Sequence, residues 1–98
     1  MNAQKVSDPQ LRLIKQIDID AVMAVELRCY PFPWTAGIFR DCLLAGHECW
    51  LLEGRSGIMG YFVLSCAAGE GHLLNICVVP EHQGHGQGRR LLRQVMQV

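Results

Sequence analysis

The chain has 98 residues, half of them hydrophobic, and its nine basic and nine acidic side chains leave a formal net charge of zero. This length supports one compact domain or part of one, and the apolar fraction excludes an intrinsically disordered chain. The balanced charge predicts no general attraction to nucleic acid or anionic membranes, and the longest mostly apolar run, residues 58–68, is shorter than the ~20 residues of a membrane helix.

The chain is expected to begin with a strand and a helix. Residues 11–17 mix apolar and polar positions in the manner of a first strand. A short carboxylate can accept hydrogen bonds from the free N–H groups of a first helical turn, so Asp18 or Asp20 is expected to cap the next element. That element is a helix over residues 19–29, on which Glu26 is expected to face solvent or a cleft.

A segment rich in proline and aromatic residues separates this helix from the next one. In Tyr30–Trp34, two prolines flank Phe32. Each proline lacks an N–H and disfavours the helical region for the residue before it, so the first helix must stop here. Thr35 is a good cap for a second helix, which is expected over residues 36–44.

Three strands are expected in the middle of the chain. Residues 49–52 and 58–66 are typical of two antiparallel strands, and residues 53–57 of the tight turn between them. Residues 73–79 are nearly all apolar, which suits a central strand covered on both faces, and Pro80 ends this strand.

The last expected element is a helix over residues 89–98, with apolar side chains on one side and polar ones around the other. The order is therefore β-α-α-β-β-β-α, an α/β arrangement without repeats or linkers. A central strand and a helix with apolar flanks normally need more sheet beside them. We therefore expect residues 1–98 to be the N-terminal portion of a domain, ending in its third helix.

Three glycines at alternate positions lie just before the last helix. Glycine permits positive φ and a close approach of the backbone, and free N–H groups at a helix N-terminus hold phosphate oxygens. Neither the P-loop pattern nor the dinucleotide fingerprint fits, because each needs a residue or spacing that is absent. From the residues alone, an anion-binding loop and a flexible turn both remain open. The segment consists of Gln83, Gly84, His85, Gly86, Gln87, Gly88 and Arg89.

The pattern Gln83-x-x-Gly86-x-Gly88 matches the Arg/Gln-x-x-Gly-x-Gly/Ala signature of the GNAT N-acetyltransferase superfamily, and residues 74–92 resemble its fourth strand, loop and third helix. The Tyr-Pro-Phe-Pro-Trp-Thr sequence and the Asn75-Ile76 pair resemble the RimI-type ribosomal-protein-alanine N-acetyltransferases. The resemblance covers nearly the whole chain. It implies a GNAT acyl-CoA N-acyltransferase fold, a mixed and mostly antiparallel sheet with helices on both faces, here without its C-terminal part.

The resemblance implies a binding site for acetyl-CoA. In such enzymes the fourth strand splays from its neighbour, and its backbone pairs with the pantetheine arm. Here that role falls to the main chain of Ile76, Cys77 and Val78, whereas the alternative is an ordinary buried β-segment. The pyrophosphate would be bound by the loop of Gln83, Gly84, His85, Gly86, Gln87, Gly88 and Arg89.

The resemblance also implies an acceptor side of the cleft, lined by Phe32, Trp34 and Asn75. The alternative for the two aromatic residues is that they pin the loop between two helices, because packing is the commoner fate of an aromatic side chain. Glu26 could contact the substrate amine, although a solvated helix carboxylate is the plainer expectation.

Acetyl transfer to an amine needs a base to deprotonate the amine and an acid to protonate the leaving thiolate. RimI-type enzymes place a glutamate base on the next strand and a tyrosine acid beyond it. No residue of this chain matches either group, so no catalytic residue is assigned. His72 and His85 lie in expected turns and are interpreted as inert.

The cysteines predict neither disulfides nor a metal. There are five, an odd number without a C-x-x-C pair, so buried free thiols in a reducing cytoplasm are expected. Cys42, His47 and Cys49 offer three soft ligands, but structural zinc normally takes four. The N-terminal ten residues lack the apolar core of a signal peptide, in keeping with a cytoplasmic location.

Together these observations favour an N-acetyltransferase that moves acetyl from acetyl-CoA to the N-terminal amine of a protein, with the N-terminal alanine of a ribosomal protein as the expected acceptor. The alternatives are a GNAT enzyme for another peptide or small amine, and a non-catalytic CoA-binding or interaction fragment. No nucleic-acid or membrane partner is expected. The exposed edge of the central strand also suggests self-association.

Overall fold

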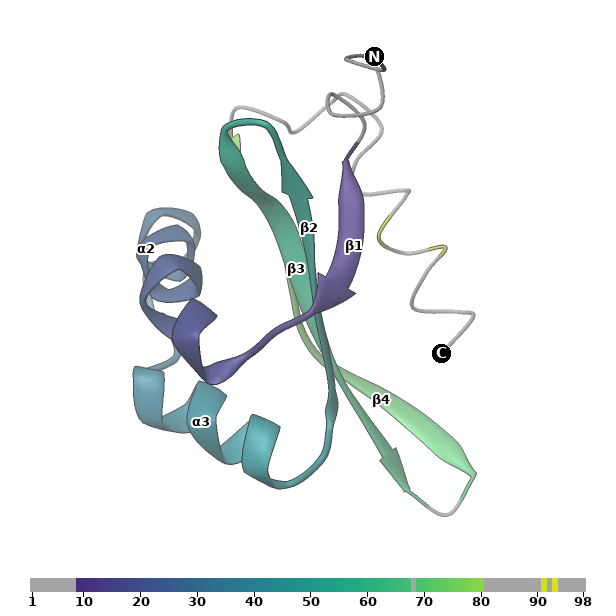
Figure 1. Ribbon diagram of the computed structural model, residues 1–98. Coiled ribbons are helices and arrows are strands. Elements are labelled where there is room, and N and C mark those ends of the chain that lie inside the picture. Colours follow the sequence, from purple (N-terminus) through teal and green to yellow (C-terminus); the bar gives the residue numbers. More distant parts are fainter. Residues whose placement is uncertain (1–8, 68, 81–90, 92, 94–98) are drawn as a thin grey trace.

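The computed structural model describes residues 9–67, 69–80, 91 and 93 (Figure 1). As far as β4 the described chain confirms the expected order of strands and helices, with one added 3-10 turn, and the helix expected over residues 89–98 lies outside the described residues except for Leu91 and Arg93. Its elements are β1 (Gln10–Leu13), η1 (Gln16–Asp18), α2 (Ile19–Cys29), α3 (Ala36–Leu44), β2 (Glu48–Gly54), β3 (Gly57–Ala67) and β4 (Glu70–Val78). Both α-helices span the ranges expected from the sequence, and the hydroxyl of Thr35 caps α3 by accepting the N–H of Ile38 at 3.2 Å.

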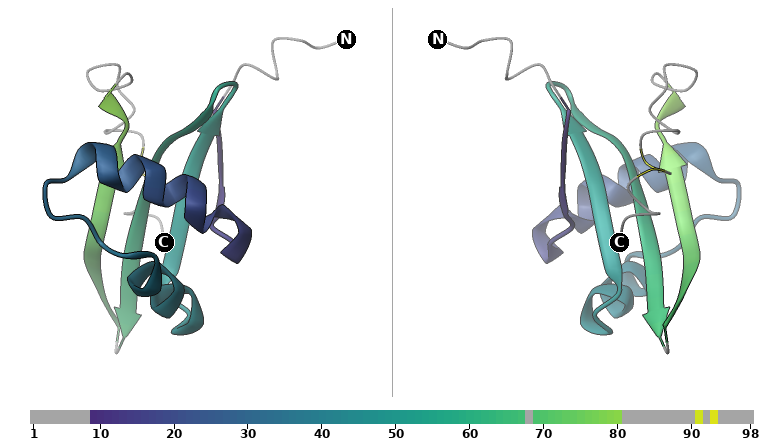
Figure 2. Two further views of the ribbon diagram at one scale, coloured as in Figure 1. Left: turned by 90° about the vertical axis from the view of Figure 1, so that its left-hand side faces the viewer. Right: turned by 90° about the vertical axis from the view of Figure 1, so that its right-hand side faces the viewer.

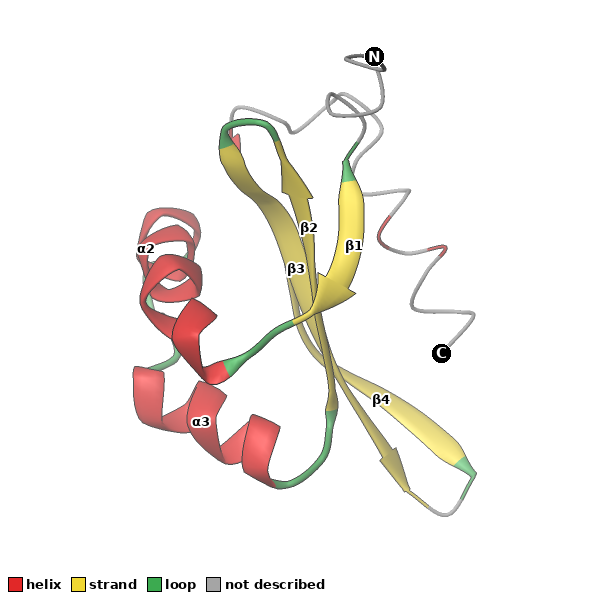
Figure 3. Ribbon diagram, viewed as in Figure 1, coloured by secondary structure: helices red, strands yellow, loops and turns green. Residues whose placement is uncertain are grey.

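The four strands form one antiparallel sheet in chain order, β1-β2-β3-β4. The helices α2 and α3 lie together on one face of this sheet, and α2 crosses it to end beside β4 (Figures 2 and 3). On the opposite face Leu91, which is helical and fully buried, completes a cluster with Leu52, Met59, Phe62 and Leu64. The described part of the chain thus confirms an α/β fold with cover on both faces.

β3 is the strand that both layers of the core share. Three consecutive residues, Tyr61, Phe62 and Val63, have an exposed fraction of 0%. Successive side chains of a strand point to opposite faces, so burial of all three requires cover on both sides. Tyr61 and Val63 pack in the cluster beneath α2 and α3, and Phe62 packs in the cluster that contains Leu91.

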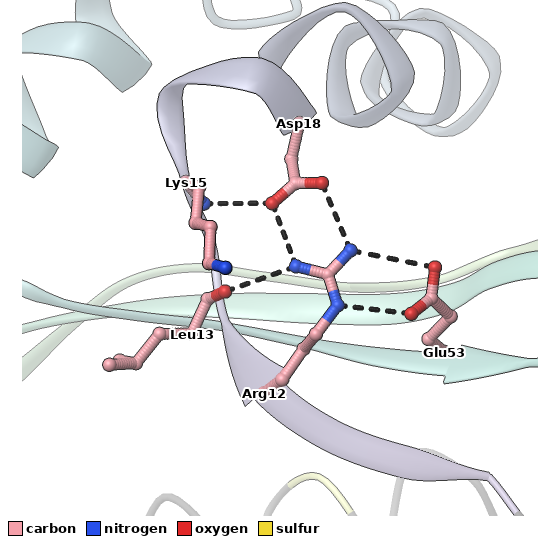
Figure 4. A network of polar contacts seen from close by, with 5 residues as sticks. All are labelled: Arg12, Leu13, Lys15, Asp18 and Glu53. Atoms are coloured by element: carbon pink, nitrogen blue, oxygen red, sulfur yellow. Dashed lines mark hydrogen bonds and ion pairs between the residues drawn. The ribbon is translucent and has the colours of Figure 1, made fainter.

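The expectation that an aspartate caps the first helix was wrong. The carboxylate of Asp18 makes no capping bond to α2. It accepts the main-chain N–H of Lys15 at 2.8 Å and two bonds from the Arg12 guanidinium, at 2.8 and 3.0 Å (Figure 4). Arg12 also donates to Glu53 of β2 at 3.0 Å. A bidentate charged partner outcompetes a single amide, so Asp18 fixes the exit from β1 instead of the entry to α2.

The apolar composition of residues 73–79 had suggested a central strand. In the structure, β4 lies at the edge of the described sheet. It pairs with β3, and its first five residues, 70–74, are exposed. Only the second half, from Asn75 to Val78, is packed against the helices or the opposite cluster. A run of apolar residues indicates that a strand is hydrophobic, but it does not indicate which neighbouring elements cover the strand.

Replacing Arg12 by Met is expected to lower the free energy of unfolding by about 1 kcal/mol at neutral pH, since about one-third of the Arg12 side chain is exposed and solvent screens its ion pairs. The bonds from Arg12 hold the pKa of Asp18 below its usual value. A depressed pKa stabilises the fold above the unfolded-state pKa, and this stability is lost as the pH falls through the folded-state pKa. The difference between wild type and variant should therefore shrink in acid, as urea titrations at neutral pH and near pH 3 would measure. Arg55→Met, at an exposed turn, is the control, and an equal loss there would contradict the assignment.

Gly60 on β3 is expected to tolerate no side chain. A Cβ at this position would lie 2.6 Å from the carbonyl oxygen of Cys77 and 2.8 Å from Cδ1 of Leu91. The carbonyl belongs to the paired strand and cannot move aside, so Gly60→Ala should cost roughly 1–3 kcal/mol in thermal or urea unfolding. Gly71→Ala is the matched control on the neighbouring strand, because its Cβ would meet Leu64 at an ordinary 3.7 Å. Equal stability of the two variants would count against this packing.

Candidate functional site

A pocket of about 340 Å³ lies between the α2–α3 loop and β4. The three residues predicted for the acceptor side come from both of these segments, and the structure brings them together here. Two come from the loop and one from the strand, positions more than forty residues apart in the chain. The lining consists of Glu26, Tyr30, Phe32, Trp34, Leu73, Leu74, Asn75 and Ile76.

The two loop aromatics have different roles in the wall of the pocket. Trp34 packs edge-on against Phe39 of α3 at a centroid distance of 5.1 Å, and Phe39 packs in turn against Tyr61 at 5.9 Å. Trp34 therefore anchors the loop while it lines the pocket. Phe32 is 92% exposed. Burial of apolar surface would stabilise it, so an exposed phenylalanine at the rim of a pocket is available to a ligand.

Glu26 was expected to face either solvent or a cleft, with a solvated carboxylate as the plainer expectation. The solvated alternative is wrong, because Glu26 is 1% exposed and lines the pocket. Its Oε2 accepts the main-chain N–H of Trp34 at 2.9 Å, and its Oε1 accepts the hydroxyl of Tyr61 and the side-chain amide of Asn75, the latter at 3.1 Å. These donors compensate part of the cost of removing a carboxylate from water.

Tyr61 serves as a neutral donor in this cluster. Burial, followed by the hydrogen bond to Glu26, raises the pKa of Tyr61 well above its usual value. The phenol therefore stays protonated across the physiological range and keeps donating to the carboxylate. The hydroxyl of Tyr61 thus joins β3 to the carboxylate of Glu26 at the back of the pocket.

The end of α2 is joined to one side of β4. The Tyr30 hydroxyl donates to the carbonyl of Ile76, and the Cys29 thiol lies 3.9 Å from the carbonyl oxygen of Val78. Neither carbonyl points toward β3, because alternate residues of an antiparallel strand bond to its neighbour. Along the predicted cofactor segment, the carbonyls of Ile76 and Val78 thus face the outer edge of β4.

Cys77, between those two residues, faces inward. The carbonyl oxygen of Cys77 approaches Gly60 of β3, and its side chain is buried beneath α2. Its sulfur lies 2.6 Å from that of Cys29. Burial first, and then the bond with Cys29, raises the pKa of Cys77 to about 12. This thiol therefore packs as a core residue and is not an activated nucleophile.

The other predicted site residues, Gln83, Gly84, His85, Gly86, Gln87, Gly88 and Arg89, lie outside the described residues. Within the described ranges no group of three or more His, Cys, Asp or Glu side chains is placed to hold a metal ion. All five cysteines are free, but Cys66 is exposed and Cys29 is half-buried, contrary to the expectation that all are buried. None of the helices in the described part of the chain is long and apolar enough to cross a membrane.

Solved structures with this fold include several acetyltransferases. The chain is 24% identical to the Escherichia coli ribosomal-protein-S18-alanine N-acetyltransferase, with a TM-score of 0.84, and covers 91% of its own length and 57% of that protein. Arabidopsis thaliana Naa50 in complex with the bisubstrate analogue CoA-Ac-MVNAL is 16% identical, with a TM-score of 0.77, and the match covers 92% of this chain and 63% of Naa50. A Brucella melitensis GNAT family acetyltransferase in complex with acetyl-CoA is 18% identical, with a TM-score of 0.73, and the match covers 93% of this chain and 68% of that protein. At these identities the likeness shows the fold.

The family follows from the sequence itself. Residues 45–98, more than half of the chain, match the model of the acetyltransferase (GNAT) domain. The chain therefore belongs to the GNAT acetyltransferase family. No curated protein sequence matches it. Its length corresponds to a little over half of the E. coli enzyme.

Sequence reasoning missed the polar cluster behind the pocket. Tyr30 and Tyr61 had not been singled out as site residues, and a solvated carboxylate had been the plainer expectation for Glu26. One signal was present, since Glu26 lies four residues after Val22 and three before Cys29, and apolar residues at these spacings share a helix face with it. A glutamate at such a position has to find donors, and those at Trp34, Tyr61 and Asn75 come from three segments that only the fold brings together.

Brief alkylation of the folded protein with iodoacetamide at pH 8 should modify Cys66 first and Cys49 and Cys77 last. The thiolate is the reactive form, and burial raises the pKa of Cys49 to about 11 and that of Cys77 to about 12. Peptide mass spectrometry at short times gives the order, with urea-unfolded protein as the control in which all thiols react alike. Modification of Cys77 as fast as Cys66 would show that β4 is not packed on α2.

Proposed function

We propose that the protein containing this chain transfers the acetyl group of acetyl-CoA to the N-terminal amine of a protein, and that its acceptor is the N-terminal alanine of a ribosomal protein. The observation that carries the proposal is the pocket beside β4 in a chain of the GNAT acetyltransferase family. The likeness to the E. coli S18-alanine enzyme supports the choice of acceptor. The peptide part of the analogue bound to Naa50 supports a protein N-terminus.

The cofactor side of the proposed site is largely main chain. The outer edge of β4, from Ile76 to Val78, would pair with the pantetheine arm, and the loop from Gln83 to Arg89 would bind the pyrophosphate. Backbone N–H groups and glycines suit this task, because they let a bulky anion come close without side chains in the way. The acetyl-CoA and CoA complexes of related GNAT proteins support acetyl-CoA as the cosubstrate.

The acceptor side would be formed by Phe32, Trp34 and Asn75. The exposed Phe32 and the two leucines of β4, Leu73 and Leu74, provide apolar contacts for the first side chains of a peptide. In the reaction the neutral amine nitrogen bonds to the thioester carbon and the C–S bond breaks, while the nitrogen loses one proton and the CoA thiolate takes one up.

Calorimetry on the full-length protein tests the cofactor site. Acetyl-CoA should bind to the wild type, and Gly86→Asp should abolish detectable binding, because it adds bulk and negative charge where phosphate oxygens would lie. Gly37→Asp is the matched control, since an acidic residue is favourable in the first turn of α3 and its Cβ meets only Thr35 at 3.7 Å.

Two outcomes would overturn parts of the proposal. Unchanged affinity in Gly86→Asp would remove the glycine segment from the site. Acetyl-CoA binding without acetyl transfer to an alanine-starting peptide, measured by mass spectrometry, would favour a different acceptor or a non-catalytic CoA-binding protein.

A further inference from the structure

Two cysteine sulfurs meet between the end of α2 and the second half of β4. Cys29 is the last residue of α2, and Cys77 lies in β4 between the two residues whose carbonyls face the outer edge. The two Sγ atoms are 2.6 Å apart, although 48 positions separate the residues in the chain. Both side chains are free thiols. The fold therefore brings together a pair of nucleophilic groups that the proposed acetyl transfer does not use.

The separation of the two sulfurs suits a disulfide and not a shared metal ion. Two thiolates on one tetrahedral zinc ion, each at about 2.3 Å from the metal, would lie about 3.7 Å apart. The sulfurs of Cys29 and Cys77 are much closer than that. At this distance they can bond to each other with little movement of either backbone, which is the geometric requirement for a disulfide.

The two thiols differ in their access to solvent. Cys29 is half-buried, whereas Cys77 is 6% exposed. Burial, followed by the bond with Cys29, also raises the pKa of Cys77 to about 12, so Cys77 holds little thiolate at neutral pH. A dissolved oxidant therefore reaches Cys29 first, and Cys77 is in place to react with the product. An accessible thiol beside a second, resolving thiol is the arrangement of a redox-sensitive pair.

We propose that Cys29 and Cys77 form a modification site, at which hydrogen peroxide produces a reversible disulfide between α2 and β4. In the first step the Cys29 sulfur bonds to a peroxide oxygen, the O–O bond breaks, and Cys29 becomes a sulfenic acid while one water leaves. In the second step the Cys77 sulfur bonds to that of Cys29, and the sulfenic hydroxyl leaves as a second water. The two thiols thus lose two hydrogens and two electrons, and one peroxide is reduced to two waters. A dithiol restores both thiols by exchange.

The disulfide fastens the end of α2 to the strand that carries the proposed cofactor edge. In the reduced protein the Cys29 thiol lies 3.9 Å from the carbonyl oxygen of Val78, and the next residue, Tyr30, donates to the carbonyl of Ile76. A covalent bond to Cys77 holds this contact region together and restricts the unfolded chain, which stabilises the fold. This inference goes beyond the proposed function, because it holds whether or not the protein transfers acetyl.

Peptide mapping tests the linkage in the full-length protein that carries Cys66→Ser. This substitution is needed because Cys66 is exposed and no Lys or Arg lies between positions 66 and 77, so trypsin leaves both cysteines in the peptide of residues 56–89. In Cys66→Ser, a link between tryptic peptides 29–40 and 56–89 can only join Cys29 to Cys77. Brief treatment with stoichiometric hydrogen peroxide should link these two peptides in most of the folded protein, and dithiothreitol should separate them.

A second variant, Cys66→Ser with Cys29→Ser, is the matched control. Peroxide should raise the midpoint of thermal unfolding of Cys66→Ser by about 5 °C or more. It should leave the midpoint of the double variant unchanged, because no disulfide can form there. In urea-unfolded Cys66→Ser the links should instead be shared among the cysteines.

Three outcomes would overturn the inference, and the first two need only Cys66→Ser, so they decide even if the double variant does not fold. Peroxide that links peptide 29–40 or 56–89 to residues 41–55 in preference to each other would place the wrong sulfurs together. Conversion of Cys29 to a sulfinic acid without a link would show that Cys77 is not within reach. An equal rise of the midpoint in both variants would exclude the disulfide as its cause. Acetyl-CoA takes no part in these measurements, so a failure of the proposed function would leave their results unchanged.

Discussion

The buried carboxylate of Glu26 is the interaction on which the geometry of the site depends. Its hydrogen bonds join α2 to the following loop at Trp34, to β3 at Tyr61 and to β4 at Asn75. A carboxylate in a dry interior is costly unless its donors stay in place, so loss of any one of them would leave a buried charge less compensated. Segments that are far apart in sequence are thereby held in a single arrangement around the pocket.

The proline-rich loop makes this arrangement possible. Because the prolines after Cys29 stop α2, the N–H of Trp34 is not used inside a helix and can donate to Glu26. The ring of Trp34 packs on α3 through Phe39, which fixes the position of that N–H. Phe32, in the same loop, is left on the surface. In this short segment, Trp34 therefore fixes the loop and donates a hydrogen bond, and Phe32 forms an exposed wall of the pocket.

β4 connects the two halves of the proposed reaction. Its outer edge carries the carbonyls of Ile76 and Val78, which Tyr30 and Cys29 approach from α2. One residue earlier, the side chain of Asn75 reaches the Glu26 cluster. If the cofactor pairs with this edge and the acceptor enters the pocket that Asn75 lines, β4 contributes to both sides of the site. Fixing two reactants on one rigid element is an efficient way to lower the entropic cost of bringing them together.

The sequence by itself determined the order of elements, the limits of both α-helices, the Thr35 cap and the family. These depend on local signals, since a proline stops a helix and a hydroxyl caps one wherever they occur. It also singled out Phe32, Trp34 and Asn75, which the structure gathers around one pocket.

Only the tertiary structure decided that Asp18 binds Arg12 instead of a helix end, that β4 lies at the edge of the described sheet, and that Glu26 is buried. Each of these depends on partners from distant segments, and hydrophobic periodicity carries no information about which polar groups will meet.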